Sequence, residues 1–176
     1  MSRTSRRGAR RAVYPGSFDP LTIAHLAIAV ATLEQCRCDS LTFVLSRAAL
    51  GKEDHSNTVD ARALHLRTLV DDQRFVVEVT SARFIAEIAR GYDVVVVGAD
   101  KWAQVLDPSW YADETSRDAA VASLPHVALV PRPPHSPIVA AREAMTVLEL
   151  ADPTLAEVSS TAVRSGRAEW AARRLS

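Results

Sequence analysis

The sequence predicts an α/β fold in which a parallel sheet carries helices on both faces. Short apolar segments typical of strands alternate along the chain with segments of helical periodicity. The clearest strand, residues 93–97, contains four consecutive valines followed by Gly98, a pattern typical of a parallel strand buried on both faces. The chain has 176 residues, of which 48% are hydrophobic, enough for one globular domain with a shared core.

The expected elements follow one another in the order of βαβ units. Strands are expected at residues 12–14, 41–45, 75–79, 93–97 and 127–130, and helices at residues 23–36, 59–70 and 83–90. Residues 46–58 are polar and are expected to form a loop. Ligands of parallel sheets bind outside the carboxyl ends of the strands, so a functional site is expected at that edge.

Charge is balanced over the whole chain but not along it. The 21 basic and 21 acidic residues cancel, yet the first eleven residues hold five arginines and no acid: Arg3, Arg6, Arg7, Arg10 and Arg11. The remainder therefore has 16 basic and 21 acidic residues, a net charge of −5, which disfavours nucleic-acid binding. We expect residues 1–11 to form a flexible leader, with an anionic contact as the alternative, and residues 12–176 to form a single domain.

The sequence has no feature typical of a secreted or membrane-spanning protein. No apolar run approaches the roughly 20 residues that cross a bilayer, and no apolar segment follows the arginine-rich start. Cys36 and Cys38 are separated by one residue, which suits neither a zinc site nor a C-x-x-C redox pair. We expect a cytoplasmic protein with reduced thiols, without a nucleic-acid or membrane partner, and compatible with a homo-oligomer.

A first candidate anion site lies where the first strand ends, in the sequence YPGSFDP of residues 14–20. Gly16 lets the backbone approach a ligand closely, and Ser17 offers a hydroxyl group. Thr22 is expected to N-cap the next helix, which places His25 in its first turn. Free N–H groups and the helix dipole attract phosphate there, and the imidazole can donate a hydrogen bond to it. A purely structural histidine is the alternative.

A second candidate phosphate site lies near the C-terminus, in the sequence VSSTAVR of residues 158–164. Ser159 or Ser160 can N-cap a short helix whose first amide groups hold a phosphate. Thr161 adds a hydroxyl group, and Arg164 adds a forked donor one turn later. A serine cap without any ligand is the alternative for this motif taken alone.

The first motif resembles the signature of the nucleotidyltransferase superfamily, in which His-x-Gly-His or Thr-x-Gly-His follows a Gly-Ser/Thr-Phe-Asp-Pro turn. The chain has GSFDP at residues 16–20 and TIAH at residues 22–25. The resemblance covers roughly residues 12–166 and implies a Rossmann-like fold, with Gly16, Ser17 and Phe18 at the bound nucleotide. Ala24 departs from the pattern, because the family has a glycine there, under the nucleotide.

The second motif is similar to Ile-Ser-Ser-Thr-x-Ile-Arg of nicotinate- and nicotinamide-nucleotide adenylyltransferases. VGAD at residues 97–100 resembles that family's Gly-x-Asp, which implies that Gly98 and Asp100 lie at the nucleotide and its ribose. Lys52 sits where the family has a lysine that contacts phosphate, and Arg62 has the position of a downstream arginine.

The resemblance also implies a set of acceptor contacts. Trp110 and Tyr111 correspond to a Trp-Tyr pair whose tryptophan stacks on a pyridine ring, and Arg132 corresponds to an arginine after the fifth strand. A core position is the alternative for Trp110. The chain has TSAR at residues 80–83 in place of a Tyr-Thr segment that helps to recognise the pyridine carboxylate, although Arg83 could itself pair with a carboxylate.

The implied reaction joins the adenylyl group of ATP to a phosphate-bearing acceptor and releases pyrophosphate. In-line attack needs no protein nucleophile, only the positioning of two anions and charge neutralisation. We assign His25 and Thr22 to the triphosphate. We assign Lys52, Ser160, Thr161 and Arg164 to its outer phosphates. Mg²⁺ is expected as the cofactor, held largely by phosphates and water without a protein metal cage.

Three functions remain open at this point. The first is adenylylation of nicotinate or nicotinamide mononucleotide for NAD biosynthesis. The second is adenylylation of phosphopantetheine, which the YPGSFDP sequence and Thr22 favour, although that family's Arg-Gly-Leu-Arg segment is absent. The third is nucleotide binding without turnover, for which Ala24 is the main support.

Overall fold

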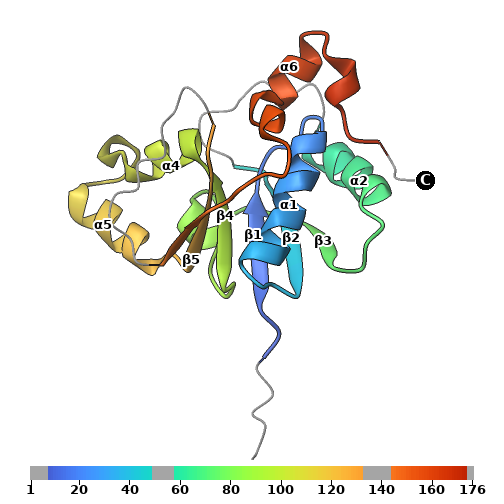
Figure 1. Cartoon of the computed structure of the whole chain (residues 1–176). Coiled ribbons are helices and arrows are strands. Elements are labelled where there is room, and N and C mark those ends of the chain that lie inside the picture. Colours follow the sequence, from blue (N-terminus) through green and yellow to red (C-terminus); the bar gives the residue numbers. More distant parts are fainter. Residues whose placement is uncertain (1–7, 49–57, 133–143, 174–176) are drawn as a thin grey trace, which may run out of the picture.

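The computed structural model describes residues 8–48, 58–132 and 144–173. Its centre is a six-stranded sheet in the order β3-β2-β1-β4-β5-β6, and every pair of neighbouring strands is parallel (Figure 1). The strands are β1 (Arg11–Pro15), β2 (Ser40–Ser46), β3 (Phe75–Thr80), β4 (Val94–Gly98), β5 (His126–Val130) and β6 (Met145–Val147). The predicted α/β, Rossmann-like fold is confirmed.

Helices connect the strands and cover both faces of the sheet. They are α1 (Ile23–Gln35), α2 (Val59–Leu69), α3 (Ile85–Ile88), α4 (Ala99–Leu106), α5 (Glu114–Ser123) and α6 (Ser160–Arg164). Three 3₁₀ turns are η1 (Pro108–Trp110), η2 (Pro153–Glu157) and η3 (Ala168–Trp170). In Figure 1, α6 lies above the carboxyl ends of the strands, close to the start of α1.

In the inner strands β1, β2, β4 and β5, alternate residues belong to two separate cores on the two faces of the sheet. In β4, Val94 and Val96 belong to a core that α1 and α2 cover, whereas Val95 and Val97 belong to a core against α3, α4 and α5. Successive side chains of a strand point to opposite faces, so a strand between two helical layers must be apolar at every position. This is why the valine run is continuous, and why its four valines are at most 2% exposed.

Some boundaries differ from those expected. The first strand begins at Arg11, and the backbone N–H groups of Arg10 and Arg11 donate to the carboxylates of Asp39 (2.6 Å) and Asp93 (2.8 Å). Residues 10 and 11, expected as the end of the leader, are therefore part of the domain. The elements α4, α5 and β6 were not expected, although the buried residues Ala99, Trp102 and Val105 of α4 recur at helical spacing.

The third helix is shorter than the expected range of residues 83–90. The Glu87 carboxylate accepts hydrogen bonds from the backbone N–H groups of Arg83 and Phe84, both at 3.0 Å. Glu87 thereby caps the helix from within, so that Phe84 stands before its first turn. Gly91, at φ 84°, follows the end of the helix in the left-handed conformation that favours glycine.

The two cysteines are free thiols buried in the core, and burial raises the pKa of both. No helix in the described part of the chain has the length and apolar character needed to cross a membrane.

Candidate active site

Two cavities open at the carboxyl ends of the strands and share one wall. Strands β1 and β4 are neighbours, but α1 packs on one face of the sheet and α4 on the other. The chain segments that follow β1 and β4 therefore run to opposite faces of the sheet. They leave a crevice between them, which is where ligands of open α/β sheets bind. The larger cavity has a volume of about 400 Å³ and the smaller one about 110 Å³. The residues lining both are Pro15, Gly16, Ser17, Ile85 and Lys101.

The turn after β1 is built around Phe18. This residue has φ 46°, in the left-handed region, and its ring is 3% exposed and packs edge-on against Tyr14 and Phe43. A Cβ atom on Gly16 would lie 2.5 Å from the Phe18 ring, so only glycine fits above it. The turn consequently presents Ser17 and the Gly16 backbone at the wall between the two cavities.

The start of α1 holds His25 in one orientation. The Thr22 hydroxyl accepts from the His25 backbone N–H, and the Thr22 backbone N–H donates to His25 Nδ1 at 3.0 Å, forming a reciprocal capping box. A ring nitrogen that accepts from an N–H group carries no proton, so the proton of the neutral ring is on Nε2. His25 lines the larger cavity, where Nε2–H can donate to an anion.

The same geometry gives Thr22 a structural role. This residue is 0% exposed, and its polar groups face His25. Thr22 therefore positions His25, and its expected contact with the triphosphate stays a prediction.

Ala24, the departure from the family motif, is 1% exposed, and its side chain lies outside the lining of the larger cavity. From the sequence alone, the Ala24 methyl group could have contacted the nucleotide. In the structure it packs in the protein interior.

We expect Ala24→Gly to lower stability and leave nucleotide affinity unchanged. Glycine costs about 1 kcal/mol relative to alanine in a helix. The Kd for ATP should stay within about twofold of the wild-type value, because no contact with the cavity is altered. Thermal unfolding and calorimetric titration measure the two quantities. A clearly weaker or tighter Kd in the glycine variant would show that the methyl group does reach the nucleotide.

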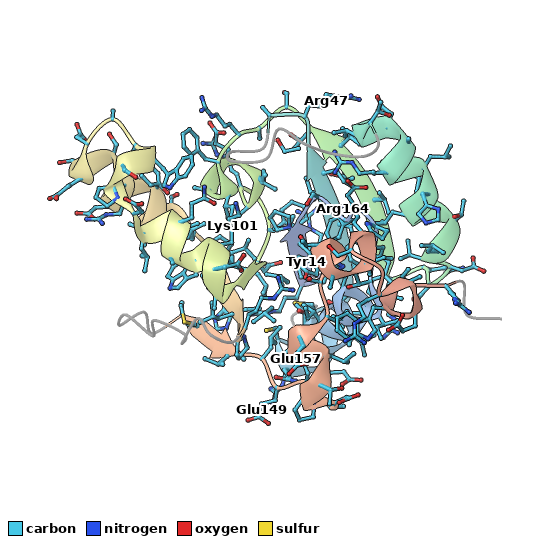
Figure 2. The ribbon with its side chains drawn as sticks, turned by 90° about the horizontal axis from the view of Figure 1, so that it is seen from above. Tyr14, Arg47, Lys101, Glu149, Glu157 and Arg164 are labelled. Carbon is cyan, nitrogen blue, oxygen red and sulfur yellow. The ribbon has the colours of Figure 1, made fainter. Side chains whose placement is uncertain are left out.

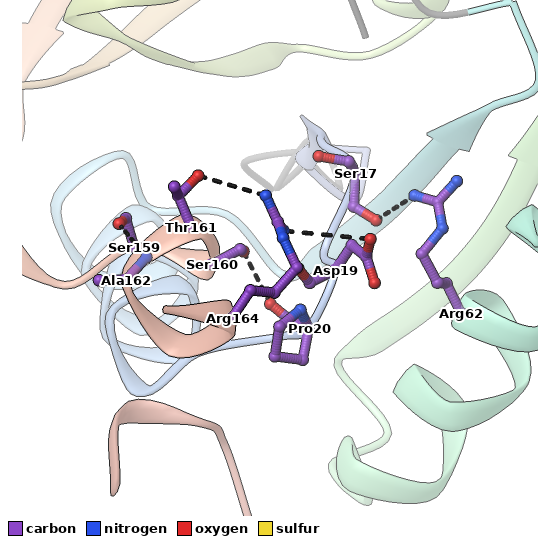
Figure 3. Close-up of polar contacts among 9 residues, drawn as sticks. All are labelled: Ser17, Asp19, Pro20, Arg62, Ser159, Ser160, Thr161, Ala162 and Arg164. Carbon is purple, nitrogen blue, oxygen red and sulfur yellow. Dashed lines mark hydrogen bonds and ion pairs between the residues drawn. The ribbon is translucent and has the colours of Figure 1, made fainter. Parts of the chain in front are cut away.

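Two arginines, one buried and one exposed, brace the turn from two sides (Figure 3). Arg62 on α2 is 5% exposed and donates to the Ser17 carbonyl oxygen. Arg164 on α6 donates to the Asp19 carbonyl oxygen, and its guanidinium lies 4.0 Å from the Asp19 carboxylate. Burial lowers the pKa of Arg62, while the charge of Asp19 acts in the opposite direction. The two arginines thus hold the backbone on both sides of Phe18.

Neither a role for Asp19 nor a contact of Arg62 was expected from the sequence, because aspartate and arginine are residue types that are usually exposed. What places them here is the packing of α2 and α6 against the turn.

Helix α6 docks on the start of α1. Ser159 caps α6 by accepting from the Ala162 N–H at 3.1 Å, and the Ser160 hydroxyl donates to the Pro20 carbonyl oxygen at 2.8 Å. Arg164 also donates to the Thr161 hydroxyl at 3.3 Å. Residues 159–161 and Arg164 line the larger cavity together with His25, so the two sequence motifs form one site. Ser160 and Arg164 join α6 to the turn, in addition to any contact with phosphate.

The end of β4 completes the larger cavity. A Cβ atom on Gly98 would lie 2.8 Å from Asp100 Oδ1, so glycine lets the Asp100 carboxylate fold back over the end of the strand. Tyr14 also lines this cavity, and burial raises the pKa of its hydroxyl group well above the usual value. Arg132, expected at the acceptor, instead lines the larger cavity and donates to the Val158 carbonyl oxygen at 3.2 Å.

The smaller cavity is apolar and aromatic. Trp110 is 36% exposed and lines it, so the core alternative for Trp110 is wrong; Trp102, 1% exposed, is a core tryptophan. Tyr111 stacks on Phe84 with ring centroids 5.6 Å apart, and its hydroxyl group donates to the Val105 carbonyl oxygen. Trp110, Tyr111 and Phe84 all line the cavity.

Of two lysines that concern the site, one was expected from the sequence and the other was found in the structure. Lys52, expected at the outer phosphates, lies outside the described residues. Lys101 on α4 lines both cavities. The sequence analysis missed Lys101, and nothing in its local sequence distinguishes it from a solvated helix residue.

The sequence matches the model of the cytidylyltransferase-like family over residues 13–166, nearly the whole range of the expected resemblance. The chain belongs to the cytidylyltransferase-like family. It is a nucleotidyltransferase, in agreement with the two motifs that meet at the larger cavity. No curated protein matches the chain.

Solved structures show the same fold. Nicotinic acid mononucleotide adenylyltransferase of Plasmodium falciparum, complexed with APC, has a TM-score of 0.62 at 12% identity, with 89% of this chain and 83% of that chain covered. The same protein complexed with NaAD has a TM-score of 0.57 at 10% identity and the same coverage.

Proposed function

We propose that this nucleotidyltransferase joins the adenylyl group of ATP to nicotinate mononucleotide, with nicotinamide mononucleotide as the weaker acceptor, and so serves NAD biosynthesis. The observation that carries this proposal is the pair of cavities that meet at Gly16 and Ser17, one lined by phosphate-binding groups and the other by aromatic rings. Two substrates bound in this way have their phosphates at the shared wall.

ATP fits the larger cavity. His25 Nε2–H and the capped start of α6 provide donors for the triphosphate, and Asp100 provides an acceptor for the ribose hydroxyls. Asp100 is the one carboxylate among the described residues that line this cavity, which agrees with a Mg²⁺ ion held mainly through phosphates and water. Such an ion would neutralise charge on the departing pyrophosphate.

A pyridine mononucleotide fits the smaller cavity. The face of Trp110 offers a stacking surface for a flat ring. The Arg83 guanidinium lies at this cavity, 5.9 Å from the centre of the Phe84 ring, and makes no hydrogen bond or ion pair with a described residue. The described lining residues include Arg83 and Lys101 but no carboxylate. A ring with an anionic substituent therefore suits this cavity better than one with a neutral amide.

The structural neighbours support the proposal in one further respect. Both are named for nicotinic acid mononucleotide as the acceptor, although at this identity they show the fold alone.

The test is a pyrophosphate-release screen with ATP, Mg²⁺ and three acceptors: nicotinate mononucleotide, nicotinamide mononucleotide and phosphopantetheine. We expect turnover with the first, identified by product mass, and a preference over the second of about tenfold or more, because hydrogen bonds to charged groups are worth roughly 1.5–3 kcal/mol. Arg83→Gln should reduce this preference, and Arg90→Gln, an exposed residue outside both cavities, should preserve it.

The other outcomes are equally informative. Turnover with phosphopantetheine alone would replace the proposed acceptor, and binding of ATP without any turnover would indicate a non-catalytic nucleotide-binding protein. An equal rate with both pyridine nucleotides would refute the role of Arg83 but keep the reaction.

A further inference from the structure

Among the described residues, Lys101 is the charged residue common to both cavities. It lies in the first turn of α4, where it forms the shared wall together with Ile85 and residues 15–17. In Figure 2, Lys101 on α4 and Arg164 on α6 lie on opposite sides of Tyr14, the residue just before the turn that follows β1. The Lys101 ammonium donates to the side-chain oxygen of Gln104, which also lines the smaller cavity.

The shared wall is where two anions have to meet. In adenylyl transfer, an oxygen of the acceptor phosphate forms a bond to the α-phosphorus, and the bond from that phosphorus to the oxygen bridging it to the β-phosphorus breaks. The bridging oxygen keeps the electron pair and leaves with pyrophosphate. Both reacting phosphates are negatively charged, so their repulsion opposes both simultaneous binding and attack.

The other described cations lie on one side or the other. Arg132 and Arg164 line the larger cavity, and Arg83 lines the smaller one. Each of them can neutralise one substrate. A charge that reduces the repulsion between two substrates has to reach both of them, and the position of Lys101 meets that requirement.

We infer that Lys101 is a catalytic residue whose ammonium contacts both phosphates in the ternary complex and offsets their repulsion. The ammonium keeps its proton throughout, so the step takes no acid or base from it. A lysine suits this role, because its compact charge sits on a flexible stem and can turn from Gln104 to the phosphates. The inference rests on the proposed adenylyl transfer, but not on the identity of the acceptor ring.

The test measures coupling between the two substrates in Lys101→Met, which keeps the apolar stem and removes the charge. The Kd of nicotinate mononucleotide is measured by calorimetry with and without an ATP analogue that carries an α,β-methylene bridge. We expect each substrate alone to bind within about threefold of wild type. With the analogue bound, the Kd of nicotinate mononucleotide should rise about tenfold or more, and kcat should fall similarly; a tenfold change corresponds to about 1.4 kcal/mol of coupling.

Two further variants separate charge from packing. Lys101→Arg keeps the charge and should recover most of the coupling, whereas Arg90→Met removes an exposed charge outside both cavities and should change nothing. Thermal melts check that each variant folds, and Lys101→Gln replaces the methionine variant if that one does not fold.

Three results would overturn the inference: unchanged coupling in Lys101→Met, weaker binding of one substrate alone with unchanged coupling, or no recovery in Lys101→Arg. If the wild-type enzyme turns over phosphopantetheine and no pyridine nucleotide, the same measurement uses phosphopantetheine. The experiment then distinguishes a wrong acceptor from a wrong role for Lys101.

Discussion

Replacing His25 by alanine is expected to lower kcat by about 10²–10³, the effect of removing one preorganised donor from a developing negative charge. Thr22 holds the imidazole through Nδ1 and thereby places the proton on Nε2, so the donor exists before substrate binds. An interaction that strengthens in the transition state changes kcat more than it changes substrate binding. Steady-state kinetics at saturating ATP and acceptor measures the effect.

Two variants sharpen this test. His65→Ala removes an exposed histidine from α2 and should leave kcat unchanged. His25→Gln keeps a residue type that forms capping boxes and retains an N–H donor, so it should lose less activity than the alanine variant. Near wild-type kcat in a folded His25→Ala variant would remove His25 from the mechanism.

Replacing Trp110 by alanine is expected to raise the KM for the acceptor by roughly ten- to a hundredfold and leave the KM for ATP nearly unchanged. Stacking of a base on an aromatic side chain is worth about 1–3 kcal/mol, and a pyridine ring should be similar in order. Trp110 lines only the smaller cavity, and the proposed triphosphate contacts line the larger one. The two substrates should therefore respond differently.

The matched control is Trp170→Ala on η3, a tryptophan outside both cavities. It should leave both KM values unchanged. A Trp110→Ala enzyme with lower thermal stability but an unchanged acceptor KM would show that the ring only packs against its neighbours.

Local patterns predicted much of the fold because the forces behind them are local. The valine run of β4 needs only two apolar faces, and the Thr22–His25 cap spans three residues. Both are therefore visible in a short window of sequence. The short elements α3 and β6 were missed or misjudged because a few residues do not establish a period, and their limits depend on individual contacts such as the Glu87 cap.

The site residues also divide into those that local sequence could predict and those that depend on tertiary packing. Gly16, Ser17 and His25 line the larger cavity together, and local sequence could group them because turn, cap and helix start all lie within ten residues; their contacts with nucleotide stay a prediction. Arg132 was expected at the acceptor but lines the larger cavity, since its place depends on how β5 lies beside β4. Thr22 was expected at the phosphates, and only the structure showed that it is buried and hydrogen-bonded to His25.

The sequence by itself determined the parallel α/β architecture and the family. Only the tertiary structure decided that the motifs form one site, through contacts such as Ser160 to Pro20 and Arg164 to Asp19, which span 140 and 145 residues. It also decided that Lys101 stands between two cavities. The physical reason is that secondary structure depends on side chains a few residues apart, whereas a cavity depends on which strands and helices become neighbours.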